Sequence, residues 1–306
     1  MRIVIFASSE FSIPLLETLH KSDHEICAVF TQPPSISGRG MKIRHNCIGM
    51  KSIELNIQIL HPININEEIE IKKLASMKTD IAIVSAYGQI LSSEVLKVPK
   101  LGFLNLHPSL LPRWRGAAPI ERAIMAGDNK TGICSIRMVK ELDAGPILAK
   151  DDIEINSYET NTSLSKKLSR IGAIQMLQVI NNLENICDSP QENKGVTYAS
   201  KIKKSETRIN WSLSGKIVDR FIRGLSEKPG AWSMLGKSRV KILKSKFVKL
   251  DGKVGNAIKS SENNSPLLVA CGKGAIEIEI LQKEGKKPIS ASEFISGHKR
   301  EIINFV

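Results

Sequence analysis

The stretch Gly102-Phe103-Leu104-Asn105-Leu106-His107-Pro108 decides how this chain folds. It begins as an extended segment, and because side chains on a strand alternate between faces, Asn105 and His107 point to one side and the leucines to the other. Pro108 lacks an N–H and keeps His107 extended, so the strand ends there. An amide and an imidazole are thus presented where a strand passes into a loop, the usual place for a reactive site in an open α/β sheet.

Strands and helices alternate on both sides of this stretch. Short apolar runs predict strands over residues 3–6, 25–30, 58–60, 80–85, 101–107, 133–139 and 147–155. Helices are expected over residues 12–20, 47–55, 67–77 and 119–126, with a long amphipathic helix over 164–183, and residues 31–46 are expected to form a polar loop. This alternation predicts an α/β domain with a mostly parallel sheet.

The composition and the pattern of expected elements change after residue 187. Residues 188–205 are polar and contain Pro190 and Gly195, which indicates a linker. One helix is expected over 214–223, followed by short strands over 239–243, 255–258, 267–270 and 275–281. Short strands separated by Gly, Asn and Ser are typical of a small barrel. The predicted organisation is therefore a catalytic domain over 1–187, a linker over 188–205 and a smaller domain over 206–306.

The positive charge is concentrated in the last third of the chain. The 306 residues carry a formal net charge of +13. Residues 1–200 hold 22 basic and 21 acidic residues, whereas residues 201–306 hold 22 basic and 10 acidic residues, a balance of +12. Such asymmetry favours a polyanionic partner for this end, nucleic acid being the commonest. A surface that only confers solubility is the alternative.

Several classes of protein are disfavoured by the composition. Residues 1–6 read as a buried strand with no charged region before them, and no apolar run of about 18 residues could span a membrane. We therefore expect a cytoplasmic protein without a membrane partner. The five cysteines are scattered and include no Cys-x-x-Cys pair, so we expect no metal site.

Asn105, His107 and Asp143 together carry the chemistry that the sequence indicates. An amide N–H can donate to a carbonyl oxygen as it becomes an oxyanion, a histidine can move protons near neutral pH, and a carboxylate in a turn can orient that histidine. The trio suits acyl transfer through a tetrahedral intermediate. No serine or cysteine lies in a nucleophile-elbow pattern, so the attacking group should come from the substrate. A purely structural Asn-x-His pair and a plain turn aspartate are the alternatives.

Residues 105–120 and 142–147 resemble the formyltetrahydrofolate-dependent formyltransferases. The central run is Ser109-Leu110-Leu111-Pro112-Arg113-Trp114-Arg115-Gly116-Ala117-Ala118-Pro119-Ile120, and it is highly specific. Further matches lie at residues 30–33, 38–40, 86–91, 127–128, 131–132, 197–202 and 208–212. The resemblance therefore covers nearly the whole chain.

This resemblance implies a Rossmann-like first domain, an OB-like second domain and a monomer without an obligate protein partner. It implies transfer of the formyl group of 10-formyltetrahydrofolate to the α-amino group of initiator methionyl-tRNA, the first step of formylmethionine translation initiation. The family's catalytic residues fall on Asn105, His107 and Asp143. Its folate-binding residues fall on Ser109, Leu110, Leu111 and Pro112.

Two groups of basic residues are candidate tRNA contacts. In the related enzymes the loop that holds Arg39, Lys42 and Arg44 enters the acceptor end of the tRNA. Basic side chains on or beside a predicted barrel strand could follow the RNA backbone. These are Lys237, Arg239, Lys241, Lys244 and Lys246. A solvated loop and a charged strand that resists aggregation are the alternatives.

The chain departs from the family pattern in two places, and two rival functions stay open. Ala7-Ser8-Ser9-Glu10 replaces a Gly-Thr-Pro-Asp/Glu turn, and Ser226-Glu227-Lys228-Pro229 replaces an Asn-Pro-Trp-Pro-like turn. Ala7 turns less freely than glycine, so we expect the backbone at the rim of the site to differ from the family pattern. One rival is a formyl enzyme acting on a nucleotide, an amino sugar or formylfolate alone. The other is a non-catalytic RNA-binding protein.

Overall fold

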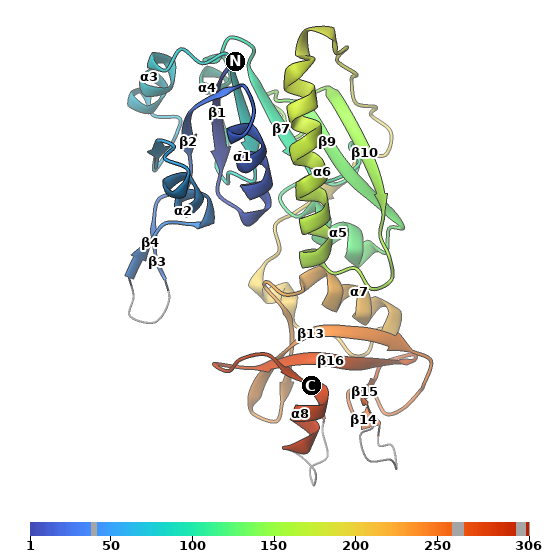
Figure 1. Cartoon of the computed structure of the whole chain (residues 1–306). Coiled ribbons are helices and arrows are strands. Elements are labelled where there is room, and N and C mark those ends of the chain that lie inside the picture. The colour runs from blue at the N-terminus through green and yellow to red at the C-terminus, as the bar shows by residue number, and fades with distance from the viewer. Residues whose placement is uncertain (38–41, 259–265, 298–303, 306) are drawn as a thin grey trace. The chain divides into compact units, whose positions relative to one another are not determined.

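The chain forms two compact units, each built from segments that alternate along the sequence (Figure 1). The computed structural model describes residues 1–37, 42–258, 266–297 and 304–305. Unit 1 comprises Met1–Pro119, Thr131–Ile153 and Ser165–Ala199. Unit 2 comprises Ile120–Lys130, Glu154–Leu164 and Ser200–Val306.

A seven-stranded sheet in the order β10-β9-β7-β6-β1-β2-β5 forms the centre of unit 1. Its strands are β1 (Arg2–Ala7), β2 (Glu25–Phe30), β5 (Ile59–Leu60), β6 (Ile81–Ser85), β7 (Phe103–His107), β9 (Lys130–Arg137) and β10 (Ile147–Glu154). The run from β7 to β5 is parallel, and β9 pairs with β7 in the antiparallel direction. Parallel strands end at one edge of a sheet, so the loops after β1, β2, β6 and β7 meet there.

Aromatic and aliphatic side chains fill the core of unit 1. Phe6 of β1 stacks on Phe30 of β2 with ring centroids 4.5 Å apart. Leu74 and Val95 join the same cluster, so two helices cover this face of the sheet. On β7 and β9, Leu106 and Ile133 lie so close to Gly172 that an added Cβ would be 2.9–3.0 Å from them. The helices are α1 (Ile13–His20), α2 (Cys47–Glu54), α3 (Glu68–Ser76), α4 (Ser93–Leu96) and α6 (Asn161–Asn181).

A curled antiparallel sheet in the order β12-β13-β16-β15-β14, with β17 paired to β16, forms the centre of unit 2. Its strands are β12 (Ala231–Leu235), β13 (Ser238–Val248), β14 (Ala257–Ile258), β15 (Leu267–Ala270), β16 (Ala275–Lys283) and β17 (Ile289–Ser290). Its helices are α5 (Pro119–Ala126), α7 (Gly215–Leu225) and α8 (Ala291–Ser296). Apolar side chains of α7 at Val218, Ile222 and Leu225 enter the core of this sheet, which is the amphipathic pattern of a helix on a barrel.

The predicted fold class, an α/β domain with a mostly parallel sheet followed by a smaller OB-like barrel, is confirmed. Residues 25–30 and 119–126 match β2 and α5 to the residue. The prediction of a loop over 31–46 was wrong in part, because β3 (Ser35–Ser37) pairs with β4 (Lys42–Arg44). Strands of three residues carry too little periodicity to be recognised. The elements α4, β12, β17 and α8 were also missed. Among the helices that the structure describes, none has the length and apolar character needed to cross a membrane.

Candidate active site

The strand β7 carries Asn105 and His107 to the edge where the parallel strands end. Asn105 pairs with Val84 of β6 on one side and with Ile136 of β9 on the other. This strand is therefore central in the sheet, and its backbone is held from both sides. Asn105 is 9% exposed and His107 is 3% exposed. Both side chains are consequently fixed in position and shielded from bulk water.

Asp143 brings its carboxylate to these two residues from the turn between β9 and β10. Its Oδ1 accepts a hydrogen bond of 3.1 Å from Asn105 Nδ2, and its Oδ2 accepts one of 2.8 Å from the backbone N–H of Gly116. Oδ2 also lies 3.6 Å from His107 Nδ1, and the carboxylate side chain is 11% exposed. The structure therefore brings the three predicted residues together, with Asn105 hydrogen-bonded to Asp143 and His107 within 3.6 Å of the same carboxylate.

The orientation of the His107 ring follows from its two nitrogens. Nε2 lies 2.9 Å from the carbonyl oxygen of Trp114. Because a carbonyl oxygen only accepts, the ring donates through Nε2, and Nδ1 faces the Asp143 carboxylate. A proton on Nδ1 would turn this approach into an ion pair. Trp114 is itself held, since its backbone N–H donates to Thr197 Oγ1 at 2.9 Å.

Gln191 is a site residue that the sequence interpretation missed. Its Nε2 donates to the backbone carbonyls of Asp143 and Gly145, each at 2.7 Å, while its Oε1 accepts from Arg115 Nη2 at 2.8 Å. The turn that carries Asp143 is thereby fixed by a residue 48 positions away. Asp143 needs this support because its φ of 48° is uncommon for a residue other than glycine. The family match at residues 197–202 pointed to Thr197, but no pattern pointed to Gln191.

The predicted folate-binding run Ser109–Pro112 is only partly accessible. Ser109 is fully buried, and its Oγ donates to the Arg113 carbonyl at 2.7 Å. Leu111 is 1% exposed and packs with Cys134 and Ile136. Leu110 and Pro112 are half-buried. Side-chain contact with a ligand is thus open to Leu110 and Pro112, whereas Ser109 and Leu111 shape the segment from inside.

The unusual Ala7-Ser8-Ser9 segment ties three strand ends together. Ala7 lies within β1 and pairs with Ser85, so the conformational freedom of glycine is not needed there. Ser8 Oγ donates to the Tyr87 carbonyl at 3.0 Å and accepts from the Gln32 backbone N–H at 3.1 Å. The loops after β1, β2 and β6 are therefore cross-linked beside the end of β7. An alanine at position 7 is compatible with this backbone.

The groups around the trio offer no nucleophile of their own. Burial raises the pKa of Cys134 to about 11, so this thiol stays protonated at neutral pH. In the part of the chain that the structure describes, no three His, Cys, Asp or Glu residues are grouped in a way that could hold a metal ion. The arrangement is suited to orienting a proton and stabilising an oxyanion rather than to covalent catalysis.

The candidate tRNA contacts are scattered, and several have partners. Arg39 lies outside the described residues, as does the side chain of Lys42, while Arg44 ends β4 and is exposed. Lys244 pairs with Glu279 at 2.7 Å and Lys246 with Glu277 at 2.9 Å across β13 and β16. The charges of these two lysines are therefore balanced within the sheet.

The remaining basic residues of β13 face a different environment. Lys237 is exposed in the turn before the strand. The guanidinium of Arg239 lies 4.2 Å from the ring centroid of Trp232, and Lys241 Nζ donates to the Pro229 carbonyl at 2.7 Å. A guanidinium stacked on an indole is a common element of RNA-binding surfaces.

Known proteins are similar to this chain over nearly its full length. A family model described as formyl transferase matches residues 1–180, and one described as formyl transferase, C-terminal domain, matches residues 201–299. Methionyl-tRNA formyltransferase of Roseobacter denitrificans is 42% identical over 297 residues, 97% of this chain and 96% of that protein. The enzyme of the same name from Paracoccus denitrificans is 41% identical over 97% of each chain.

Solved structures share the fold at lower sequence identity. Methionyl-tRNA formyltransferase of Clostridium thermocellum superposes with a TM-score of 0.59 at 17% identity, covering 91% of this chain and 98% of that one. The sugar 3N-formyl transferase WlaRD gives a TM-score of 0.67 at 19% identity, over 94% and 99% of the two chains. HypX of Aquifex aeolicus in complex with tetrahydrofolic acid gives 0.66 at 17%, with this chain spanning 48% of its length. Given the matched models and the relatives above 40% identity, this chain belongs to the formyl transferase family.

Proposed function

We propose that this protein transfers the formyl group of 10-formyltetrahydrofolate to the α-amino group of methionine on initiator methionyl-tRNA. The single observation that carries the proposal is the convergence of Asn105 and His107 on the Asp143 carboxylate in a chain 42% identical to a methionyl-tRNA formyltransferase. The basic balance of residues 201–306 supports an RNA substrate. We further propose a monomer that acts in the cytoplasm.

Asn105 is the proposed donor to the formyl oxygen as negative charge develops on it. One Nδ2 hydrogen is bound to Asp143 Oδ1, and within the described residues the second has no acceptor. Such a donor, fixed before the reaction, stabilises an oxyanion without reorganisation. The residues present therefore fit a formyl donor at this edge of the sheet. We place Leu110 and Pro112 against the folate, on the surface that Ser109 and Leu111 support from inside.

His107 and Asp143 are proposed to transfer protons and to stabilise the charge that develops during the reaction. With Nε2 directed to the Trp114 carbonyl, His107 Nδ1 faces Asp143, so a proton that Nδ1 takes up during the reaction would place positive charge near the developing oxyanion. The attacking α-amine has an ordinary pKa of about 8, so a useful neutral fraction exists at pH 7. Asp143 then helps this nitrogen lose its proton, through a water molecule. The formylated folate nitrogen must gain a proton as it leaves.

We propose that the two ends of the chain have different roles. We assign residues 1–187 to catalysis and residues 206–306 to tRNA binding, with 188–205 as the connection. Arg39, Lys42 and Arg44 are proposed to meet the acceptor end of the tRNA. Lys237, Arg239 and Lys241 are the stronger tRNA candidates of β13, because Lys244 and Lys246 already pair with glutamates.

A transfer assay tests this function. Purified protein with formyltetrahydrofolate should formylate initiator methionyl-tRNA much faster than elongator methionyl-tRNA, an amino sugar nucleotide or water. Faster reaction with a small amine or with water would remove the tRNA assignment. Asn105→Ala should lower kcat by about 10²–10³ while tRNA affinity stays nearly unchanged. Full turnover in that variant would contradict the proposed role of the trio.

A further inference from the structure

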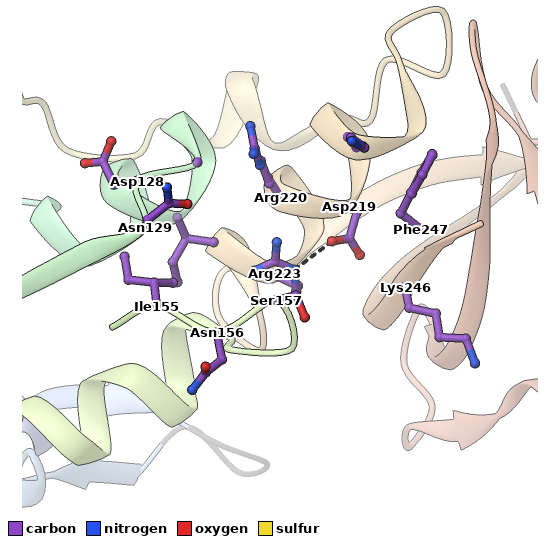
Figure 2. Close-up of a pocket in the computed structure, with 13 residues that line it drawn as sticks. Asp128, Asn129, Ile155, Asn156, Ser157, Asp219, Arg220, Arg223, Lys246 and Phe247 are labelled. Atoms are coloured by element: carbon purple, nitrogen blue, oxygen red, sulfur yellow. Dashed lines mark hydrogen bonds and ion pairs between the residues drawn. The ribbon is translucent and has the colours of Figure 1, made fainter. Parts of the chain in front are cut away.

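A pocket of about 430 Å³ opens within unit 2, apart from the trio, and Lys246 is the one basic residue discussed so far that lines it (Figure 2). Its walls are the segment after α5, the segment after β10, the outer stripe of α7 and part of β13. The first two are joined by a hydrogen bond of 2.8 Å from the Ile155 backbone N–H to the Asn129 carbonyl. The pocket is therefore a built feature of this unit, of a size that accepts a small molecule or a nucleotide.

One ion pair in the pocket is fully satisfied and supports the wall. Arg223 Nε donates to Asp219 Oδ2 at 2.7 Å, and its Nη1 donates to the Glu159 carbonyl at 2.9 Å. Ser245 Oγ donates to Asp219 Oδ1 at 3.0 Å. Both charged residues are buried, and Figure 2 shows their pairing as a dashed line. Their charges cancel, so this pair holds α7 in place and leaves no charge for a ligand.

Two cations of α7 form no close ion pair among the described residues, although Arg220 is near enough to Asp219 to favour its charged form. Lys216 and Arg220 are four positions apart, so they lie on the same stripe of the helix. The Arg220 guanidinium lies directly against Gly127, whose φ is +78° and where an added Cβ would collide with it. Among the described residues, Arg220 is thus positioned by packing against Gly127 rather than by a hydrogen bond. In Figure 2 the Asp128 carboxylate points away from Arg220.

The rest of the lining comprises Asp128, Lys246, two isoleucines, and aromatic, amide and hydroxyl groups. The Phe247 ring lies against Gly215 and Gly274, each of which leaves room for it by lacking a Cβ. Lys216 Nζ lies 5.8 Å from the centroid of this ring. Asn129, Asn156 and Ser157 add uncharged hydrogen-bonding groups. A fixed ring beside two unpaired cations is the combination that binds a nucleotide by its phosphate and its flat face.

We propose that this pocket binds one nucleotide of the tRNA, with the phosphate on Arg220 and Lys216 and the ribose or base against Phe247. The proposal rests on the proposed function, because that function supplies the RNA. It adds a second contact region to the basic residues of β13. It also gives Gly127 a role, since only glycine lets the guanidinium lie where it does.

The test compares Arg220→Gln and Lys216→Gln with Lys286→Gln, which removes the same charge from an exposed turn of the same unit. Binding of initiator tRNA is measured by fluorescence titration at several salt concentrations. We expect affinity to fall about 5–20-fold in each pocket variant and the slope of log K against log salt to decrease by about 0.7–0.9. Lys286→Gln should change neither by more than a small amount, and its kcat at saturating methionyl-tRNA should equal that of the wild type.

Arg220→Lys guards against a variant that fails to fold, because it keeps the charge and should keep most of the salt slope. Slopes for Arg220→Gln equal to those of the wild type would overturn the proposal. So would tight binding of free AMP to the wild type with unaltered tRNA binding in the variants, since the pocket would then serve a free nucleotide. Because the binding titration needs no catalysis, absence of formyl transfer by the wild type would count against the proposed function alone.

Discussion

The trio of unit 1 and the pocket of unit 2 use charge in opposite ways. Each carboxylate oxygen of Asp143 has a hydrogen-bond donor, at 3.1 Å and 2.8 Å, before any substrate is present. In the pocket, Arg220 and Lys216 form no close ion pair with the residues that the structure describes, and the nearby Asp219 is already paired with Arg223. A group that stabilises a transition state must be oriented in advance, whereas a group that binds a polyanion gains from exchanging water and small ions for phosphate. Changes at the trio should therefore lower kcat, and changes in the pocket should weaken tRNA binding.

The largest effect is expected from Asp143→Ala. The change removes the acceptor of Asn105 Nδ2 and of the Gly116 N–H, and it removes the negative charge near His107 Nδ1. We expect kcat to fall by about 10³–10⁴, with little change in the KM for methionyl-tRNA. Asp143→Asn is the matched control, since it keeps the volume but not the charge. A loss confined to KM in either variant would refute the contrast drawn between the two regions.

Part of the trio could be predicted from sequence because its geometry is local. Asn105 and His107 share a face since the strand repeats every two residues, and Pro108 fixes where that strand ends. The position of Asp143 beside them depends on the antiparallel register of β7 and β9, which no local pattern encodes. The sequence suggested Asp143 as a turn carboxylate that could orient the histidine, and the family resemblance assigned it the catalytic role.

The contacts that support the site could not be predicted in this way. Gln191 reaches Asp143 across 48 positions, from a segment whose polarity and Pro190 indicated only a linker. The ion pairs of unit 2 could not be predicted either, because the sequence shows the lysines but not the glutamates that pair with them. The register of β13 and β16 sets Lys246 opposite Glu277. Such pairings follow from the sheet, and they decide which cations remain for RNA.

A smaller effect is expected from a change at Gln191. This residue contacts the backbone of the turn that carries Asp143 and does not contact the Asp143 carboxylate. Gln191→Ala removes both donors to the carbonyls of Asp143 and Gly145. We expect kcat to fall about tenfold, since a turn with an unusual φ loses support and the carboxylate loses precision of placement. Gln191→Glu is the control, because it keeps an acceptor for Arg115 but not the donors. Equal activity of Gln191→Ala and the wild type would show that the turn keeps its conformation without Gln191.

The smallest effect concerns a carboxyl group of unit 2 that lacks the support given to Asp143. Glu121 on α5 accepts one long side-chain hydrogen bond, 3.3 Å from Asn161 Nδ2, and burial raises the pKa of its carboxyl group. A raised pKa means that the folded protein binds a proton that the unfolded chain has already lost. Stability therefore falls as pH rises above the ordinary pKa of the carboxyl group.

Replacement by an uncharged amide should remove this cost at neutral pH. Glu121→Gln is expected to raise Tm by about 1–3 °C at pH 8, with the gain shrinking as the pH falls towards the ordinary pKa of a glutamate carboxyl group. Thermal unfolding of both proteins across this range measures the difference, with Glu284→Gln as an exposed control in the same unit. A gain that is independent of pH would attribute the effect to packing. A loss at pH 8 would mean that the charge of Glu121 is stabilised like that of Asp143, which would remove the difference between the two carboxylates.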